Sequence, residues 1–236
     1  MTGPRENHLL AALPKSACER LAVLLQPVEM SPGQVLHESG DNMNYVYFPT
    51  TAIVSLMYIT RSGASAEIAL VGNEGVVGIA LFMGGLSTVS RAIVQSAGEG
   101  FRLKAQAMGR EFDRSGSVMH LFLTYTMALT SQIGQIAACN RHHSVDQQLC
   151  RWLLLHLDRL QGNELVVTQE LIASMLGVRR ESVTESAHKL QAAGLIRCAR
   201  GHVTVIDRTG LEKRTCECYA AVRNEYERLL PDPMHA

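Results

Sequence analysis

A segment in the C-terminal third of the sequence carries polar side chains at positions i, i+1, i+4, i+5 and i+8. This spacing gathers them on one face of a helix. They are Arg180, Glu181, Thr184, Glu185 and His188. Their donors and acceptors could hydrogen-bond to base edges in the major groove of DNA. Polar residues on a single helix more often form only a solvated surface, so the chemistry of this face depends on what surrounds it.

Positive charge is concentrated around this face. The chain of 236 residues has 22 Lys and Arg against 22 Asp and Glu, and its formal net charge is zero. That balance argues weakly against a protein that binds nucleic acid over its whole surface. Residues 168–206 nevertheless contain five basic and three acidic side chains, a local net charge of +2. The basic side chains that could reach phosphates are Arg179, Lys189, Arg197 and Arg200.

Two helices joined by a glycine turn are predicted to position the polar face. Thr168 is a favourable N-cap, and Gly177 can adopt the left-handed conformation that ends a helix. A second helix over residues 179–193 would bury one apolar stripe and end at Gly194. The stripe would consist of Val183, Ala187 and Leu190. This arrangement is typical of a helix-turn-helix.

A small hairpin is predicted after the second helix. Apolar residues at 195–196 and 203–206 flank the turn sequence Arg200-Gly201-His202. Such a hairpin would be the wing of a winged helix-turn-helix. The cap, the glycine turn, the polar face and the wing together predict a DNA-binding protein. The predicted DNA-binding residues are Thr168, Gln169, Arg179, Arg180, Glu181, Thr184, Glu185, His188, Lys189 and Arg200.

The rest of the chain predicts an α+β fold with an N-terminal antiparallel β-roll, or jelly roll. Residues 9–25 indicate one or two short helices, with Pro14 opening the second. In residues 28–108, short β-rich runs alternate with turn signals, as in antiparallel barrels and jelly rolls. Helix formers return from Gly109 onward. A helix is also expected over residues 147–160, ended by Gly162-Asn163.

A long helix over residues 120–139, continuing towards Val145, is predicted to be a dimerisation helix. Its three- and four-residue repeat is too polar for a lone buried helix and would suit pairing with a symmetry mate. The repeat consists of Leu121, Tyr125, Ala128, Gln132, Gln135, Cys139 and His142. The alternative is a helix packed on the barrel. The expected domains are the roll at residues 1–117, the dimerisation helix at 118–144 and the DNA-binding domain at 145–236.

These parts and their order resemble the Crp/Fnr family of bacterial regulators over nearly the whole chain. The similarity is strongest in Thr168-Gln169-Glu170-Leu171-Ile172-Ala173, in Leu176-Gly177-Val178-Arg179-Arg180-Glu181-Ser182-Val183, in Leu190 and in Gly194-Leu195-Ile196. The segment from Pro32-Gly33 to Gly40-Asp41 is similar to the first turn of the family's roll. The resemblance implies a homodimeric transcription regulator on palindromic double-stranded DNA. RNA polymerase is the implied partner, and no enzymatic activity is implied.

The predicted base contacts depart from the family pattern at one position. The family usually reads DNA through an Arg-Glu pair early in the second helix and an Arg one turn later. Arg180 and Glu181 match the pair, whereas Glu185 stands at the third position. A carboxylate cannot donate to guanine but can accept from cytosine N4. We therefore expect the target site to depart from the family's commonest palindrome.

The expected ligand pocket departs further. Cyclic-AMP-binding members carry a Gly-Glu motif and an Arg-Ser or Arg-Thr pair in the roll. Ile79 stands here in place of that Glu, and Arg91-Ala92 replaces the pair at a different spacing. An effector phosphate would meet backbone N–H groups and one guanidinium. The candidate ligand-binding residues are Glu74, Gly75, Gly78 and Arg91. The alternatives are a solvated Arg91 and a Glu74 that caps a turn, and the sequence identifies no cofactor.

The six dispersed cysteines indicate reduced thiols in a cytoplasm. Cys139 precedes His142-His143, but adjacent histidines point to different faces of a helix, which favours surface or hinge residues over a metal site. Cys216-Glu217-Cys218 is not a Cys-x-x-Cys motif. Iron–sulfur members of the family carry an N-terminal cysteine cluster where this chain has only Cys18. No metal site and no catalytic residue are predicted.

Three classes of protein fit these patterns. One is a dimeric regulator that responds to a small-molecule effector, and another is a regulator that acts through DNA and protein contacts alone. The third is an enzyme with a cupin-like roll. The roll has His37 but no His-x-His with a downstream Glu and His, which disfavours a metal enzyme. The absence of an apolar span and of a secretory signal predicts a cytoplasmic protein without membrane contact.

Overall fold

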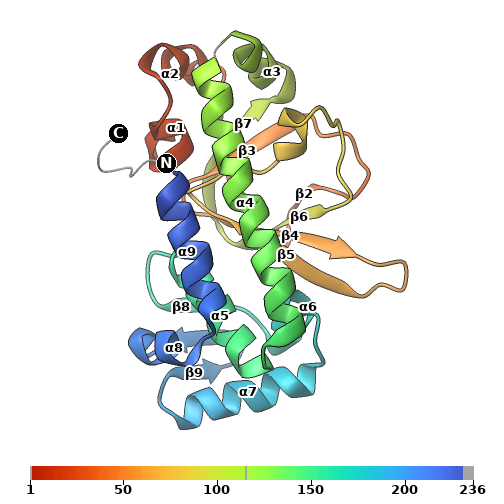
Figure 1. The fold of residues 1–236 in the computed structure, drawn as a ribbon, viewed down its shortest axis with the longest axis vertical. Helices are drawn as coiled ribbons and strands as arrows, with labels where there is room; N and C mark the ends of the chain where they lie inside the picture. The colour runs from red at the N-terminus through yellow and green to blue at the C-terminus, as the bar shows by residue number, and fades with distance from the viewer. Residues whose placement is uncertain (1, 115, 231–236) are drawn as a thin grey trace.

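The computed structural model describes residues 2–114 and 116–230. A β-roll lies beside one long helix, and the helices and small sheet of residues 145–214 lie at the end opposite to the N-terminal helices, whereas the last helix runs back beside the long helix (Figure 1). The N-terminal elements are η1 (Pro4–Glu6), α1 (His8–Ala11) and α2 (Lys15–Ala22). Pro14 is the N-cap of α2, which confirms that it opens the second helix.

The roll consists, within residues 2–114, of seven strands in two antiparallel sheets. The strands are β1 (Gln26–Met30), β2 (Val35–His37), β3 (Tyr45–Pro49), β4 (Ile53–Ile59), β5 (Ser65–Val71), β6 (Arg91–Ser96) and β7 (Gly98–Lys104). One sheet has the order β1-β7-β3 and the other the order β2-β6-β4-β5. The inward side chains of Val46, Phe48 and Val71 are buried in its core. The predicted antiparallel roll is confirmed.

The strand-rich region ends earlier than predicted, because α3 (Ala105–Arg114) begins ahead of Met108. After it, α4 (Gly116–His142) runs along the axis of the molecule (Figure 1). Val118, Phe122 and Leu129 on one side of α4 pack into the core of the roll. Within residues 2–114 and 116–230, no helix combines the length and the hydropathy of a membrane span.

The predicted seam of the dimerisation helix is wrong in its choice of face. Tyr125, Ala128, Gln132 and Cys139 are buried inside a single chain, so they cannot meet a symmetry mate. The reason is α9 (Glu217–Leu229), which folds back along α4 (Figure 1). Tyr226 of α9 donates a hydrogen bond to Gln132 Oε1 at 3.0 Å. Gln132, Gln135 and Cys139 of the seam therefore meet α9 and its N-cap, Tyr125 packs into the roll, and a different side of α4 faces solvent.

The C-terminal unit begins with α5 (Val145–Leu157), which Ser144 starts with a capping box. The helix ends at Leu157, before the predicted Leu160 and well before Gly162. The other elements of the C-terminal unit are β8 (Glu164–Val166), α6 (Gln169–Leu176), α7 (Arg180–Ala192), β9 (Ile196–Ala199), β10 (His202–Val205) and α8 (Arg208–Arg214). The roll also contains the short helix η2 (Ile79–Phe82). The sheet order is β8-β10-β9.

A second hydrophobic core, separate from the one inside the roll, is shared by the roll and the C-terminal unit. Ile53 and Met57 of β4 lie in the same cluster as Trp152 and Leu153 of α5. Ser65 Oγ of the roll also lies 2.7 Å from Ser174 Oγ of α6. Because burial of apolar surface is the main stabilising contribution in folding, this shared core couples the position of the helix-turn-helix to the roll.

Glu67 of β5 makes the stability of the protein depend on pH. It is buried, and its carboxyl group accepts a hydrogen bond from Ser55 Oγ at 2.5 Å. Burial raises the pKa of Glu67 from 4.5 to about 7. The folded chain keeps a proton that the unfolded chain loses, so the contribution of this group falls as the pH rises from 4.5 to about 7.

We expect Glu67→Gln to stabilise the protein more at about pH 8 than at about pH 4, by on the order of 3 kcal/mol at most. The amide keeps a neutral side chain at every pH and avoids a buried charge. Urea unfolding of both proteins at the two pH values measures the difference. An effect of equal size at both values would show that Glu67 does not hold a proton in the folded chain.

Candidate nucleic-acid interface

The predicted helix-turn-helix is present in the structure. Thr168 Oγ1 accepts a hydrogen bond from the backbone N–H of Leu171 at 3.2 Å, which caps α6. Gly177 ends α6 with φ 67°, in the left-handed region that favours glycine. Helix α7 then buries the predicted stripe against α5 and α6. The buried residues are Val183, Ala187 and Leu190.

The polar face of α7 points away from this core. It lies at the end of the molecule opposite to α2 and α3 (Figure 1). Four of its predicted residues are exposed, and they are Arg180, Glu181, Glu185 and His188. Thr184 is half-buried, and its hydroxyl donates to Gln169 Oε1 at 2.7 Å. Thr184 and Gln169 therefore join α6 to α7, while the four exposed residues are accessible to a partner.

Two predicted contact residues pair with each other across one helical turn. Lys189 Nζ lies 2.8 Å from Glu185 Oε1 and 3.9 Å from Asp146 Oδ2. The hydrogen bond with Glu185 raises the pKa of Lys189, so its ammonium stays charged. Arg180 Nε lies 3.7 Å from Glu170 Oε2. These pairs are exposed, so DNA phosphates can compete for their cations at little cost.

The wing completes a groove beside α7. Strands β9 and β10 meet at Arg200 with φ 45° and Gly201 with φ 84°, a turn in which both central residues are left-handed. A cavity of about 370 Å³ lies between the wing and α7. Five predicted residues line it, and they are Thr168, Gln169, Arg180, His188 and Arg200. Arg179 is the exposed N-cap residue of α7.

Strand β8, the third strand beside the wing, was not predicted. It pairs with β10, and Glu164 Oε1 lies 2.8 Å from His202 Nδ1. Leu165 is buried whereas Val166 is exposed, an alternation that indicates a half-buried strand. With only three residues, the strand is too short for that signal to be found in the sequence.

The four candidate ligand residues of the roll have structural partners of their own. Glu74 Oε1 lies 2.8 Å from Arg159 Nη2, in the segment that follows α5. Arg91 Nη2 lies 3.1 Å from Glu38 Oε1. A Cβ on Gly75 would lie 2.4 Å from the Tyr125 hydroxyl, so glycine there allows α4 to approach. Gly78 has φ 107° and packs against strand β3.

A cavity of about 600 Å³ lies where the N-terminal helices, the turn at Glu74 and α9 meet. Leu155, Arg159 and Tyr226 are among the residues that line it. It was not predicted from the sequence, because its walls come from segments that are far apart in the chain.

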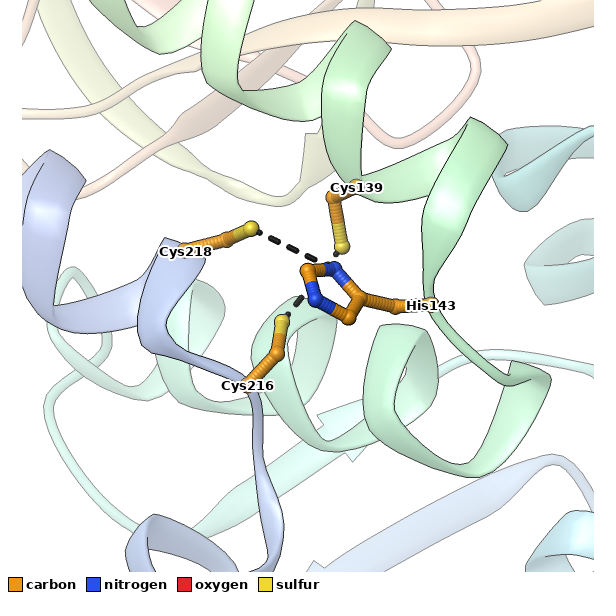
Figure 2. A group of neighbouring side chains, drawn as sticks. All are labelled: Cys139, His143, Cys216 and Cys218. Carbon is orange, nitrogen blue, oxygen red and sulfur yellow. Dashed lines mark hydrogen bonds between the residues drawn. The ribbon is translucent and has the colours of Figure 1, made fainter.

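A cluster of thiols and one imidazole was also missed. Cys139, His143, Cys216 and Cys218 lie together at the junction of α4 and α9 (Figure 2). The prediction considered the adjacent histidines, but Cys139 and His143 are four residues apart and share one helix face. That spacing, followed later by a Cys-x-Cys pair, was the signal available in the sequence.

Two family models match the chain in the expected order. One is described as a cyclic nucleotide-binding domain and matches residues 27–115. The other is described as a Crp-like helix-turn-helix domain and matches residues 147–214. The two matches together span about two thirds of the chain. No curated protein matches the sequence.

Several solved structures share the fold. A protein from Eubacterium rectale, described as a regulator of the crp/fnr family, is 17% identical with a TM-score of 0.70, over 87% of this chain and 96% of that one. FixK2 from Bradyrhizobium japonicum is 14% identical with a TM-score of 0.68, over 81% and 98%. A protein from Thermus thermophilus, described as a transcriptional regulator of the CRP family, is 19% identical with a TM-score of 0.66, over 79% and 95%.

Proposed function

Because the chain belongs to the Crp/Fnr family of DNA-binding transcription regulators, which are not enzymes, we propose that it binds a palindromic double-stranded DNA site as a homodimer. Each α7 would enter the major groove, and each wing would contact the adjacent backbone. In this proposal each expected domain has one role: the roll at residues 1–117 senses the signal, the helix at 118–144 forms the dimer, and residues 145–236 bind DNA.

The exposed polar face of α7 is the observation that carries this proposal. Arg180 can donate two hydrogen bonds to guanine, and Glu181 or Glu185 can accept from cytosine N4. Thr168, Arg179 and Arg200 lie around that face, where phosphate contacts would fix the register on the duplex. A solvated face would not require a wing that closes a groove beside it.

An exposed stripe along α4 supports the homodimer. Met119, Leu123 and Met127 are 45%, 46% and 56% exposed. The stripe continues through the exposed residues Thr130, Gly134, Ala137 and Arg141. Successive positions are three or four residues apart and alternate between the two steps from Leu123 onward, the spacing of a coiled-coil seam. The space beside Gly134 is open, so two helices could approach closely there.

The partners of the candidate ligand residues favour a signal other than a cyclic nucleotide at the family's usual position. Glu74 is held by Arg159 and Arg91 by Glu38. The second candidate function is therefore a ligand-independent regulator that acts through DNA and protein contacts only. In either case we propose that the dimer works in the cytoplasm and meets RNA polymerase at the promoter.

We expect Arg180→Ala to weaken binding to the selected site by about 1–3 kcal/mol per half-site, roughly 5- to 150-fold each, because each α7 loses a bidentate guanine contact. Fluorescence anisotropy with a labelled duplex measures the change. Arg110→Ala is the matched control, since Arg110 is exposed on α3 at the far end of the molecule. Equal affinities of the Arg180 variant and wild type would remove that residue from the interface.

A further inference from the structure

Four potential metal ligands meet where the end of α4 joins the start of α9. Cys139 and His143 lie one turn apart at the end of α4, Cys216 is the N-cap residue of α9, and Cys218 is in its first turn. The four ligand atoms all lie within 4.8 Å of one another. Figure 2 shows the three thiols arranged around the imidazole ring of His143.

The distances fit a tetrahedral ion. Cys139 Sγ lies 3.5 Å from Cys216 Sγ, and Cys218 Sγ lies 3.5 Å from His143 Nδ1. Zn–S distances of about 2.3 Å and Zn–N distances of about 2.0 Å place two sulfurs about 3.8 Å apart, and a sulfur and a nitrogen about 3.5 Å apart. We propose that these four side chains bind one Zn²⁺ in a closed structural site.

The donor set selects zinc among common metals. Three thiolates and one imidazole form a closed tetrahedral ligand set of the kind that structural zinc takes, whereas calcium and magnesium require oxygen ligands. The three cysteines are buried, and His143 is half-buried. Four protein ligands leave no position for water, so the site is structural and not catalytic.

Neighbouring side chains orient the ligands. Glu217 Oε1 lies 3.3 Å from His143 Nε2, on the ring nitrogen that faces away from Cys218. A metal-bound histidine usually donates its other N–H to a carboxylate, which fixes the tautomer that ligation needs. Gln135 Nε2 donates to Cys218 Sγ at 3.0 Å, which favours the thiolate over the thiol.

The charge of the site has a counterpart nearby. Zn²⁺ with three thiolates carries a net charge of −1, and ligation releases the thiol protons to solvent. Arg151 of α5 is buried, and it places a positive charge beside Asn140, the residue that follows Cys139. Arg151 Nη2 donates to Asn140 Oδ1 at 3.3 Å. Within residues 2–114 and 116–230, no carboxylate oxygen lies within 4.0 Å of its guanidinium.

The ion would connect two parts of the molecule that otherwise meet through packing and a few hydrogen bonds. Cys139 and Cys216 are 77 positions apart in the chain. Cys139 would attach the ion to α4, the helix that carries the exposed dimer stripe. Cys216 and Cys218 would attach it to the start of α9, which follows α8 of the helix-turn-helix unit. A zinc clamp therefore fixes the direction of the DNA-binding unit relative to the dimer helix. The clamp stands independently of the proposed DNA binding, because its test reads metal content.

The test uses the full-length protein purified under reducing conditions without chelator, with metal measured by mass spectrometry. We expect about one zinc per chain, the stoichiometry of a single closed site. Cys216→Ser and His143→Ala should each lower the retained zinc at least about tenfold. Cys198→Ser is the matched control, because that half-buried cysteine lies on β9, away from the cluster, and it should retain the metal.

A second measurement needs no variant that could fail to fold. Wild-type protein is stripped of metal, reduced and titrated with Co²⁺, and the expected spectrum combines thiolate-to-cobalt charge transfer with the intense d–d bands of tetrahedral cobalt. A protein that takes up neither zinc nor cobalt after reduction would overturn the proposal. This holds also for a protein that was isolated with a Cys139–Cys216 disulfide and then reduced. Zinc retained equally by folded Cys216→Ser would overturn it as well.

Discussion

Met127→Glu should convert the proposed dimer into a monomer and weaken binding to the palindromic site by about 10²- to 10⁴-fold. Met127 is 56% exposed in the centre of the α4 stripe, so the change costs the single chain little. In a dimer, however, it would bury two carboxylates close together in an apolar seam. In a dimer, binding of one α7 to its half-site holds the second α7 close to the other half-site at a high effective concentration. A monomer loses this advantage.

Light scattering at micromolar concentration and anisotropy with the selected duplex measure the two effects. Met83→Glu is the matched control, because Met83 is exposed on the roll beside η2 and lies outside the stripe. It should leave both mass and affinity unchanged. A Met127→Glu protein that remains a dimer would show that the copies pair through another surface.

Arg159→Met should lower the free energy of unfolding by about 3–5 kcal/mol, because it leaves a buried carboxylate without its cation. The side chains of Arg159 and Glu74 are 7% and 15% exposed. Both Nε and Nη2 of Arg159 lie 2.8 Å from Glu74 Oε1, which joins the segment after α5 to a turn of the roll. The substitution therefore breaks a contact between the two parts of the chain.

The double variant Glu74→Gln, Arg159→Met separates this explanation from simple loss of packing. Removing both charges should recover most of the lost stability, since no unpaired charge stays buried. Urea unfolding of the four proteins completes the cycle. If the free energy of unfolding of Arg159→Met alone lies within about 1 kcal/mol of wild type, water reaches Glu74 and replaces the guanidinium.

The helix-turn-helix could be predicted because its signals are local. Thr168, Gly177 and the stripe of Val183, Ala187 and Leu190 act within a few residues of where they stand. Capping and left-handed turns depend on short-range geometry, so the sequence carries them directly. The family resemblance then placed the roll and the long helix in the right order.

The face of α4 could not be predicted, because it depends on a partner about ninety residues away in the chain. The polar repeat at Gln132 and Cys139 is typical of a dimer seam, yet α9 covers it within one chain. Periodicity shows that a helix has a buried face but does not identify what buries it. The same distance in sequence concealed the four ligands at the end of α4, which only the return of α9 brings together.

The candidate ligand residues stay a prediction, but the sequence concealed their partners for a related reason. Glu74 and Arg91 are charged residues near glycine turns, a pattern typical of a phosphate site. Each instead has a charged partner, Arg159 and Glu38 respectively. An ion pair between segments 85 positions apart leaves no trace in the local sequence. The signal that controls this regulator therefore has to be sought with assays on the whole protein.

Selection of genomic DNA fragments by the purified full-length protein, at about 0.15 M salt where phosphate contacts are screened as in the cell, tests the proposed DNA binding most directly. Wild type and Arg180→Ala are selected in parallel, each with and without cyclic nucleotides. We expect wild type to enrich one palindrome in both conditions and Arg180→Ala to lose preference at one base pair of each half-site. A folded, dimeric wild-type protein that enriches no sequence in either condition would contradict the proposed function.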